Sequence, residues 1–227
     1  LLIDPVYPSL ALLAVYLVGS LTNYVRSEAD RARIRSAFGY YVSPTVVEEL
    51  ARTPDRLKLG GDLRDVTLLF ADVRGFSRLS EGMTAEELVR FINKLFTPLA
   101  DEILAHRGTI DKFMGDAVMV LFGAPHCSAD DARRAVTCAV QMQSAMEDIN
   151  RLHAARDLPP LFMGAGINTG HVMAGVLGST LHSEYTVIGN EVNLASRIEA
   201  FSLRGQVLIS ETTFERCDGF VATGEPM

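Results

Sequence analysis

The stretch GTIDKFMGDAVMVLFG, residues 108–123, contains two apolar runs that a Gly-Asp pair separates. Every residue from 117 to 122 is apolar, so both faces of an extended chain would be buried, which is typical of a central strand. The first run, Thr109–Phe113, joins it through the Gly-Asp turn. Lys112 and Asp116 bring charges to this hairpin, and a charge beside a buried sheet costs free energy unless something pairs with it. The sequence therefore first raises the question of which group pairs with the Asp116 carboxylate.

Strand and helix patterns flank this hairpin on both sides. Further strands are expected at residues 65–70, 161–169, 184–188 and 207–210. Further helices are expected at residues 84–107, 130–155 and 190–201, followed by a short helix that runs through residue 216. Gly170 is expected to turn the chain after the strand that ends at residue 169. The order strand–helix–strand–strand–helix–strand predicts an α+β fold with a ferredoxin-like split βαβ core. We expect helices on one face of its sheet, and a second face that is free or covered by a partner.

The N-terminal stretch 5–25 carries no charged residue and is long enough to cross a hydrocarbon core as a helix. A buried core helix is the alternative reading. The arginines that follow the stretch predict that its C-terminal side lies in the cytoplasm; they are Arg26, Arg31, Arg33 and Arg35. We therefore expect the chain at the cell membrane, with its globular part in the cytoplasm.

Three regions follow along the chain. Residues 1–25 are expected to be a transmembrane helix at the end of a larger membrane or sensor region, because the chain begins with Leu1 rather than Met. Residues 26–62 form a charged connector that ends in a loop over residues 53–62, which contains proline and glycine. Residues 63–227 form the globular domain.

Composition excludes several classes of function. The 227 residues carry 21 Lys and Arg against 28 Asp and Glu, a formal net charge of −7. This balance argues against a nucleic-acid surface held by phosphate contacts. The chain has three cysteines and no CxxC pair, so a disulfide framework or a zinc site is not expected.

Two carboxylates are expected to converge at one end of the sheet. Asp72 comes just after the strand at residues 65–70, and Asp116 lies in the hairpin turn. In a split βαβ sheet the first strand lies beside the hairpin, so both side chains can reach the same ion. Magnesium typically takes one or two carboxylates and completes its shell with water and phosphate oxygens. Two solvated turn aspartates would fit the spacing equally well.

Two further segments have features of a nucleotide site. In the loop Val73–Ser77, Gly75 would let backbone N–H groups approach a phosphate, although such a short loop is a weak motif. Asn193 and Arg197 are four residues apart, so they share one face of the helix at residues 190–201. An amide and a guanidinium there could orient a ribose and stabilise a phosphoryl oxygen, although helix surfaces often carry such pairs.

Three motifs together are similar to one family. FADVRGFS at 70–77, DKFMGDAVMVLFG at 111–123 and YTVIGNEVNLASRIE at 185–199 resemble the catalytic domain of the class III nucleotidyl cyclases. The resemblance covers roughly residues 36–220. It implies a head-to-tail homodimer with active sites at the interface, which converts a nucleoside triphosphate to a 3′,5′-cyclic nucleotide and pyrophosphate by attack of the ribose 3′-hydroxyl on the α-phosphate.

The resemblance also implies roles for single residues. Each site would hold two magnesium or manganese ions, and the residues that bind them would be Asp72, Val73 and Asp116. Asn193 and Arg197 would act on the ribose and the transition state. Five residues would contact the substrate. Lys112 and Thr186 would meet the base, and three residues of the loop after the first strand would also contact the substrate; they are Gly75, Phe76 and Ser77.

The choice of base follows from hydrogen bonding. Lys112 only donates, and Thr186 can accept from an exocyclic amine, so the pair matches N1 and N6 of adenine. The sequence therefore resembles the adenylate cyclases with a lysine and threonine pair, and we expect ATP as substrate. A guanylate cyclase is the alternative within the family, and a catalytically silent nucleotide-sensing or dimerisation domain is the alternative outside enzymes.

The flanks of the domain extend the resemblance and also depart from it. AFGYYVSPTVVEEL at 37–50 resembles the transducer element of membrane-linked bacterial cyclases, and DPVYP with the apolar span is similar to receptors with a CHASE-type sensor. His182 stands where many relatives carry arginine. No lysine follows Lys112, although relatives supply a late phosphate-binding lysine. We therefore expect the domain to be cut short at its C-terminus.

Overall fold

The computed structural model describes residues 15–26, 60–155, 157–179 and 183–225. The chain divides into two compact units, Leu1–Val47 and Glu48–Met227. In the first unit, residues 15–26 form a helix with exposed apolar side chains. Within the described ranges, none of the helices has the length and apolar character that crossing a membrane requires. Residues 5–14 of the predicted span and residues 27–59 of the predicted connector lie outside the described residues.

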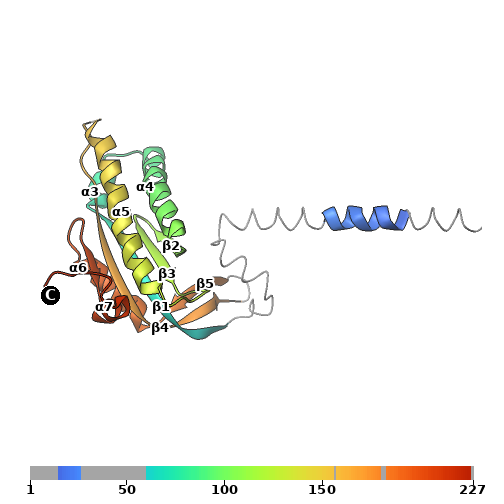
Figure 1. Cartoon of the computed structure of the whole chain (residues 1–227). Coiled ribbons are helices and arrows are strands. Elements are labelled where there is room, and N and C mark those ends of the chain that lie inside the picture. Colours follow the sequence, from blue (N-terminus) through green and yellow to red (C-terminus); the bar gives the residue numbers. More distant parts are fainter. Residues whose placement is uncertain (1–14, 27–59, 156, 180–182, 226–227) are drawn as a thin grey trace, which may run out of the picture. The chain divides into compact units, whose positions relative to one another are not determined.

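Two long antiparallel strands form the centre of the second unit (Figure 1). They are β1 (Gly60–Arg74) and β4 (Phe162–Gly178), and they pair over the whole of β1. β1 is longer than predicted at both ends. Residues 60–62, predicted as a loop, pair with β4, and Asp72 lies inside the strand rather than after it. The polar and glycine-rich ends of β1 hid its length, because the prediction relied on the apolar run alone.

The predicted turn at Gly170 is wrong. β4 passes through this residue without interruption, and Gly170 pairs with Val66 of β1. A Cβ atom at Gly170 would lie 2.7 Å from Cγ of Glu191 on helix α6 (Asn190–Phe201). The glycine therefore makes room for a helix that packs on the strand, and it does not reverse the chain.

The hairpin and the strand order confirm the predicted core. β2 (Thr109–Met114) and β3 (Ala117–Phe122) flank a turn in which Gly115 has φ +68°, a conformation that favours glycine. The strands follow the order β2-β3-β1-β4-β5, where β5 is Ser183–Ile188, and β6 (Val207–Ile209) pairs with β4 in parallel. The first four positions are those of a split βαβ sheet.

Two long helices cover one face of the sheet, α4 (Ala85–Ala105) and α5 (Asp131–Ala154). Thr84 begins α4 with a capping box, because its hydroxyl accepts from the backbone of Glu87 while the Glu87 carboxylate accepts from the Thr84 N–H. The short helices α3 (Phe76–Ser80) and α7 (Glu211–Cys217) also contribute side chains to this core. Its largest fully buried side chains include Leu69, Leu95, Leu99, Ile103, Phe122 and Met142.

Helix α6 covers part of the opposite face, which was predicted to be free or covered by a partner. A second core there contains Ala195 of α6 with Leu68 and Phe70 of β1. Since side chains alternate along a strand, Asp72 faces the same side as Leu68 and Phe70. A Cβ atom at Gly166 would overlap the backbone nitrogen of Glu199, so the helix backbone lies directly against β4. Asp72 and helix α6, which carries Asn193 and Arg197, therefore lie on the same face of the sheet, and Val73 faces the other side.

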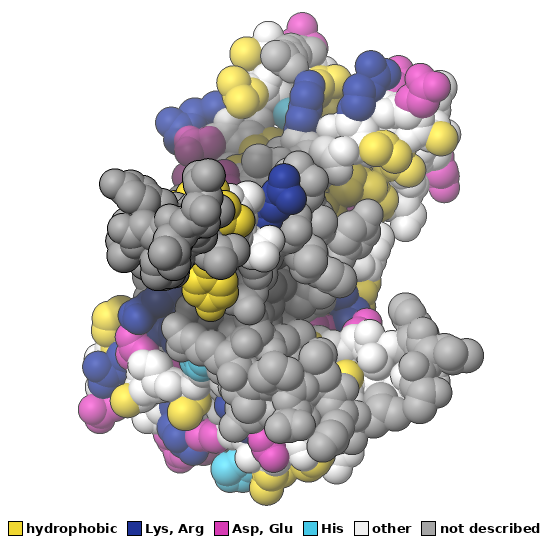
Figure 2. Space-filling view, turned by 90° about the vertical axis from the view of Figure 1, so that its right-hand side faces the viewer, with side chains coloured by type: hydrophobic (Ala, Val, Ile, Leu, Met, Phe, Trp, Pro, Cys, Tyr) yellow, Lys and Arg dark blue, Asp and Glu magenta, His cyan; other side chains and the backbone are white. Residues whose placement is uncertain are grey.

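The surface of the described residues is mixed in charge. On the face shown in Figure 2, acidic and basic side chains are interspersed, with hydrophobic side chains between them. The sequence-based expectation that the chain does not bind nucleic acid stays a prediction.

Candidate functional site

The structure brings Asp72 and Asp116 together. Asp72 lies directly opposite Ala117, the first residue of β3, and Asp116 is the residue before it. Burial, followed by the negative charge of Asp72, raises the pKa of the Asp116 carboxyl above its ordinary value. No ion pair joins Asp116 to a basic side chain among the described residues. The convergence predicted from the strand order is therefore present, and it joins two groups of like charge.

Arg74 and Glu199 extend this pair, and we call the four residues Asp72, Arg74, Asp116 and Glu199 the carboxylate cluster. The Arg74 guanidinium lies 3.5 Å from Asp72 and 2.6 Å from the Glu199 carboxylate. It also donates to the Glu199 carbonyl oxygen and to the hydroxyl of Ser202, so it joins β1 to α6. Burial raises the pKa of Glu199; Arg74 opposes this effect, and Asp72 and Asp116 add to it. The carboxylate cluster thus contains three carboxylates and only one guanidinium.

The carboxylate cluster has the donors that a hard divalent cation prefers. Two converging carboxylates leave room for water and substrate phosphates in the shell of magnesium. The side chain of Val73 is buried in the helix-covered core, so only its backbone oxygen could contribute. Among the described residues, no group of three or more His, Cys, Asp or Glu side chains is arranged to hold a metal ion. Asp72 and Asp116 could supply two carboxylate ligands to such an ion.

The segment after β1 begins a helix rather than an open loop. Gly75 is the N-cap residue of α3 with φ +78°, and Phe76 and Ser77 form the first turn. The ring of Phe76 lies 6.3 Å from that of Phe91 on α4, which anchors the turn. Gly75 and Ser77 are exposed. Their contact with a phosphate stays a prediction.

Lys112 and Thr186 also come together, although they lie on the two edges of the strand order. Lys112 Nζ is 2.7 Å from the Glu184 carboxylate and 3.6 Å from that of Asp111. The Thr186 hydroxyl donates to Asp111 over 3.0 Å. The hydrogen bond that Lys112 donates to the Glu184 carboxylate is the main cause that raises the pKa of Lys112. The sheet must therefore curl until β2 meets β5, and we call Asp111, Lys112, Glu184 and Thr186 the edge cluster.

Asn193 and Arg197 lie exposed on the outer side of α6. The packing side of the same helix contains Ala195, which is fully buried, with Val192 packed beside it. No hydrogen bond or ion pair joins Asn193 or Arg197 to the carboxylate cluster or to the edge cluster in the described part of the chain. Within one chain, the two side chains are thus available to another molecule.

Sequence reasoning missed Asp111, Arg74, Glu184 and Glu199. Asp111 could have been noticed, because a charged residue between apolar neighbours in a predicted strand requires a partner. Arg74 could have been noticed for the same reason beside Asp72. Glu184 and Glu199 gave no such signal, since both lie in segments where a charged side chain is ordinary. His182 lies outside the described residues.

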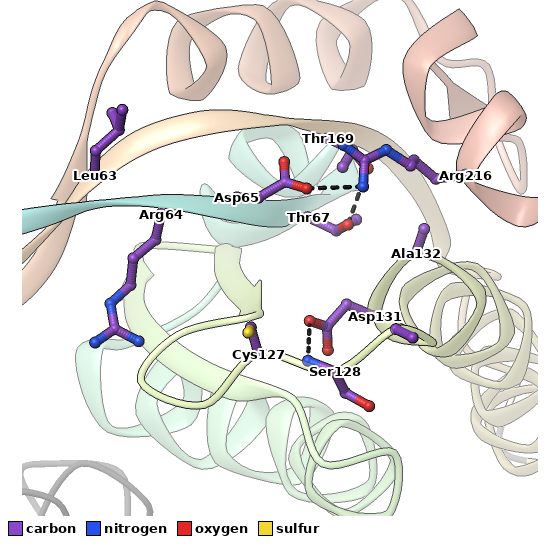
Figure 3. Close-up of a pocket in the computed structure, with 11 residues that line it drawn as sticks. Leu63, Arg64, Asp65, Thr67, Cys127, Ser128, Asp131, Ala132, Thr169 and Arg216 are labelled. Carbon is purple, nitrogen blue, oxygen red and sulfur yellow. Dashed lines mark hydrogen bonds and ion pairs between the residues drawn. The ribbon is translucent and has the colours of Figure 1, made fainter.

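A hollow of about 420 Å³ lies elsewhere on the domain (Figure 3). Asp65 and Arg216 line it and form an ion pair of 2.9 Å, and the hydroxyl groups of Thr67 and Thr169 are 2.9 Å apart. None of the predicted site residues lines this hollow. Asp65 and Asp72 are seven residues apart on β1, about 23 Å along a strand. The hollow is therefore not part of either cluster.

Comparison with known sequences places most of the chain in one family. Residues 61–224 match the family model described as the adenylate and guanylate cyclase catalytic domain. An uncharacterized protein from Mycobacterium tuberculosis is 37% identical over 171 residues, which are 74% of this chain and 28% of that protein. The chain thus spans less than a third of the length of this curated relative.

Solved structures agree with the family match. The guanylyl cyclase Cya2 is 49% identical, with a TM-score of 0.67, over 70% of this chain and 80% of its own. The adenylyl cyclase CyaB from P. aeruginosa is 39% identical, with a TM-score of 0.68, over 70% of this chain and 83% of its own. A guanylyl cyclase domain from Blastocladiella emersonii, described as a non-canonical dimer, is 27% identical, with a TM-score of 0.63, over 69% of this chain and 85% of its own.

Proposed function

Because the chain belongs to the family of adenylate and guanylate cyclase catalytic domains, we propose that it converts ATP to 3′,5′-cyclic AMP and pyrophosphate. One observation carries this choice of substrate. Lys112 and Thr186 lie in one cluster, where a lysine donates and a threonine hydroxyl can accept. Adenine offers an acceptor at N1 and a donor at N6, and guanine offers the reverse pattern at O6 and N1–H.

The carboxylate cluster is proposed to hold the divalent ions of the reaction. Asp72 and Asp116 would be ligands, together with the backbone oxygen of Val73. When bound, magnesium or manganese would supply positive charge at the α-phosphate and lower the pKa of the ribose 3′-hydroxyl. The exposed backbone around Gly75, Phe76 and Ser77 is proposed to lie against the triphosphate, since a helix start offers unpaired N–H groups.

The remaining groups are proposed to come from a second copy of the chain. Asn193 and Arg197 are exposed on α6, so a partner molecule can bring them, together with its own edge cluster, to a substrate held by the carboxylate cluster of the first. Asn193 would orient the ribose, and Arg197 would stabilise the charge that develops on the α-phosphate during in-line attack. A homodimer would then contain two sites, each built from both chains.

The test is product formation from ATP and, separately, from GTP with manganese, with Asp72→Ala as the inactive control and Asp101→Asn as a matched surface control on α4. The proposal predicts cyclic AMP from the unmutated chain and from Asp101→Asn only. Cyclic GMP as the main product would instead support a guanylate cyclase, the activity in the name of the 49% identical Cya2. No product from either nucleotide would contradict the enzyme and favour a silent nucleotide-sensing or dimerisation domain.

Mixing variants tests the shared site. Asp72→Ala and Arg197→Ala should each be inactive alone, because every site in either homodimer lacks one group. A mixed dimer has one site with both defects and one intact site, so mixing should restore up to a quarter of the activity for random pairing in equal amounts. A mixture as inactive as its components would contradict the shared site.

We also propose that the chain acts at the cell membrane as part of a receptor of the CHASE type, with its catalytic domain in the cytoplasm. The support is the uncharged stretch 5–25, the arginines after it and the exposed apolar side chains of the helix at residues 15–26. Cell fractionation tests the location. The chain should sediment with membranes and lose this property when residues 5–25 are deleted, and soluble behaviour of both forms would contradict it.

A further inference from the structure

A β-bulge places Asp111 in the edge cluster. Ile110 pairs with Val120 and Lys112 pairs with Met119, so Asp111 is an extra residue on β2 without its own partner on β3. Neighbouring residues normally point to opposite faces of a strand, and a bulge changes this direction. Asp111 and Lys112 consequently reach the same group of side chains, and Lys112 Nζ lies 3.6 Å from the Asp111 carboxylate.

The Asp111 carboxylate is almost fully enclosed. Its side chain is 1% exposed, and Oδ2 accepts the hydrogen bond from the Thr186 hydroxyl over 3.0 Å. Oδ1 is buried and has no hydrogen-bond partner within the described ranges. Burying a carboxylate costs free energy, which the nearby ammonium of Lys112 partly offsets. Packing alone therefore does not explain why an aspartate occupies this buried position.

We propose that Asp111 is a positioning residue that selects adenine by fixing the direction of the Thr186 hydroxyl. The inference rests on the proposed function, because it concerns the base of the nucleotide that Lys112 and Thr186 would contact. Asp111 itself does not need to touch the base.

The Thr186 hydroxyl has a single proton to donate. An ionised carboxylate only accepts hydrogen bonds, so the proton of the Thr186 hydroxyl must point toward Asp111. The lone pairs of the oxygen then remain for the ligand, and Thr186 acts as an acceptor. Lys112 has three N–H donors, of which Glu184 takes one over 2.7 Å. The pair thus presents an acceptor on Thr186 and the remaining N–H donors of Lys112.

This pattern fits adenine and rejects guanine. The N6 amine of adenine can donate to Thr186, and its N1 can accept from Lys112. With guanine, the O6 acceptor would face a hydroxyl that has no proton to give, and N1–H would face an ammonium. Without Asp111, the hydroxyl can rotate and donate to O6, so Thr186 would serve either base. Loss of Asp111 should therefore weaken discrimination more than it weakens binding of nucleotides in general.

The experiment compares Asp111→Leu, which has a similar branched shape but no acceptor, with Asp111→Asn, whose amide oxygen can still accept from Thr186. Two quantities are measured in the full chain. The first is the ratio of kcat/KM for ATP to that for GTP, and the second is the ratio of the Kd of the α,β-methylene analogue of GTP to the Kd of the corresponding analogue of ATP. We expect Asp111→Leu to lower both ratios about 10- to 100-fold, since unpaired polar groups discriminate strongly. Asp111→Asn should retain more of the preference, and the surface control Asp101→Asn should retain all of it.

A second substitution separates this role from a structural one. In a Thr186→Val background the hydroxyl is absent, so Asp111→Leu should change neither ratio further, whereas in a Thr186→Ser background it should act as it does in the unmutated chain. Equal losses for both nucleotides, with unchanged ratios in folded Asp111→Leu, would overturn the inference. An unmutated chain that binds neither analogue would overturn it too. Absence of cyclic product, with the binding ratio still responding as expected, would contradict only the proposed function.

Discussion

Asp111 and Asp116 lie five residues apart in one hairpin, yet their surroundings differ. The buried Asp111 carboxylate has the Lys112 ammonium at 3.6 Å and the Thr186 hydroxyl at 3.0 Å. Asp116 instead meets Asp72, a second carboxylate, and burial together with Asp72 raises its pKa. The buried carboxylate of the edge cluster therefore has a cation and a hydroxyl beside it within one chain, whereas the carboxylate cluster holds three carboxylates and one guanidinium.

This difference suggests how the two clusters share the work. A region whose polar groups already pair with one another is preorganised and can recognise the shape of a ligand without a further ion. A region with surplus carboxylates becomes more stable when a cation arrives. Removing the Lys112 charge should thus destabilise the edge cluster, whereas neutralising Asp116 should stabilise the carboxylate cluster in the absence of metal. The effects on catalysis should follow a different order.

The largest effect should follow from Asp116→Asn, which removes a proposed metal ligand. We expect turnover of ATP to fall more than about 100-fold, because changes even to groups behind metal ligands cost 10- to 100-fold. Steady-state formation of cyclic AMP with manganese measures it. Retention of more than a tenth of the activity would show that the metal binds elsewhere, and the carboxylate cluster would then not differ from the edge cluster in metal binding.

Gly166→Ala should damage one cluster and spare the other. Its Cβ would overlap the backbone of Glu199, so α6 must move away from β4, and overpacking of this kind costs about 1–3 kcal/mol. Arg74, which bonds to Glu199, would lose its position, while Lys112 and Thr186 keep theirs. Urea unfolding should therefore show lower stability, and binding of the ATP analogue should keep its preference over the GTP analogue. Equal loss of that preference would show that the clusters are not independent.

Lys112→Met should lower stability, because it leaves the buried Asp111 carboxylate without its cation. We expect a loss of about 1 kcal/mol at neutral pH, reduced from the value for buried pairs since the Lys112 side chain is 35% exposed. The pKa of Lys112 is raised in the folded state, so this stabilisation is present below the ordinary lysine value of 10.5 and is lost as pH rises through the folded value. Urea unfolding at neutral pH measures it, with Lys94→Met on α4 as the control. A variant as stable as the unmutated chain would contradict the pairing.

The smallest effect should be a gain in stability from Asp116→Asn without metal. The raised pKa means that the ionised carboxyl is disfavoured in the folded state, so at neutral pH it costs stability that the amide does not. The melting midpoint should rise on the order of 2 °C. The gain should shrink as pH falls through the folded pKa, and vanish below the ordinary value of 3.8, where the carboxyl is protonated in both states. A lower midpoint at neutral pH would show that the carboxylate is already paired.

Much of this arrangement was predictable from sequence, because it depends on strand order. The apolar hairpin at 108–123 indicated a split βαβ core, and that core places Asp72 beside the residue after Asp116. The length of β1 and the course of β4 were not predictable from apolar patterns, since residues 60–62 are polar or glycine and Gly170 has a packing role. The edge cluster was predicted only in part, because the family resemblance paired Lys112 with Thr186 but did not include Asp111 or Glu184. It depends on curling of the sheet and on one bulge at Asp111, and neither leaves a periodic signal.

The central claim is that the carboxylate cluster binds a divalent cation and the edge cluster does not. Melting midpoints measured against manganese concentration test it without any need for turnover, in the unmutated chain, Asp72→Asn and Lys112→Met. The account predicts that manganese raises the midpoint of the unmutated chain and of Lys112→Met, by the equivalent of about 2.7 kcal/mol at a hundred times the Kd, and leaves Asp72→Asn unchanged. An equal rise in Asp72→Asn, or no rise in the unmutated chain, would contradict it.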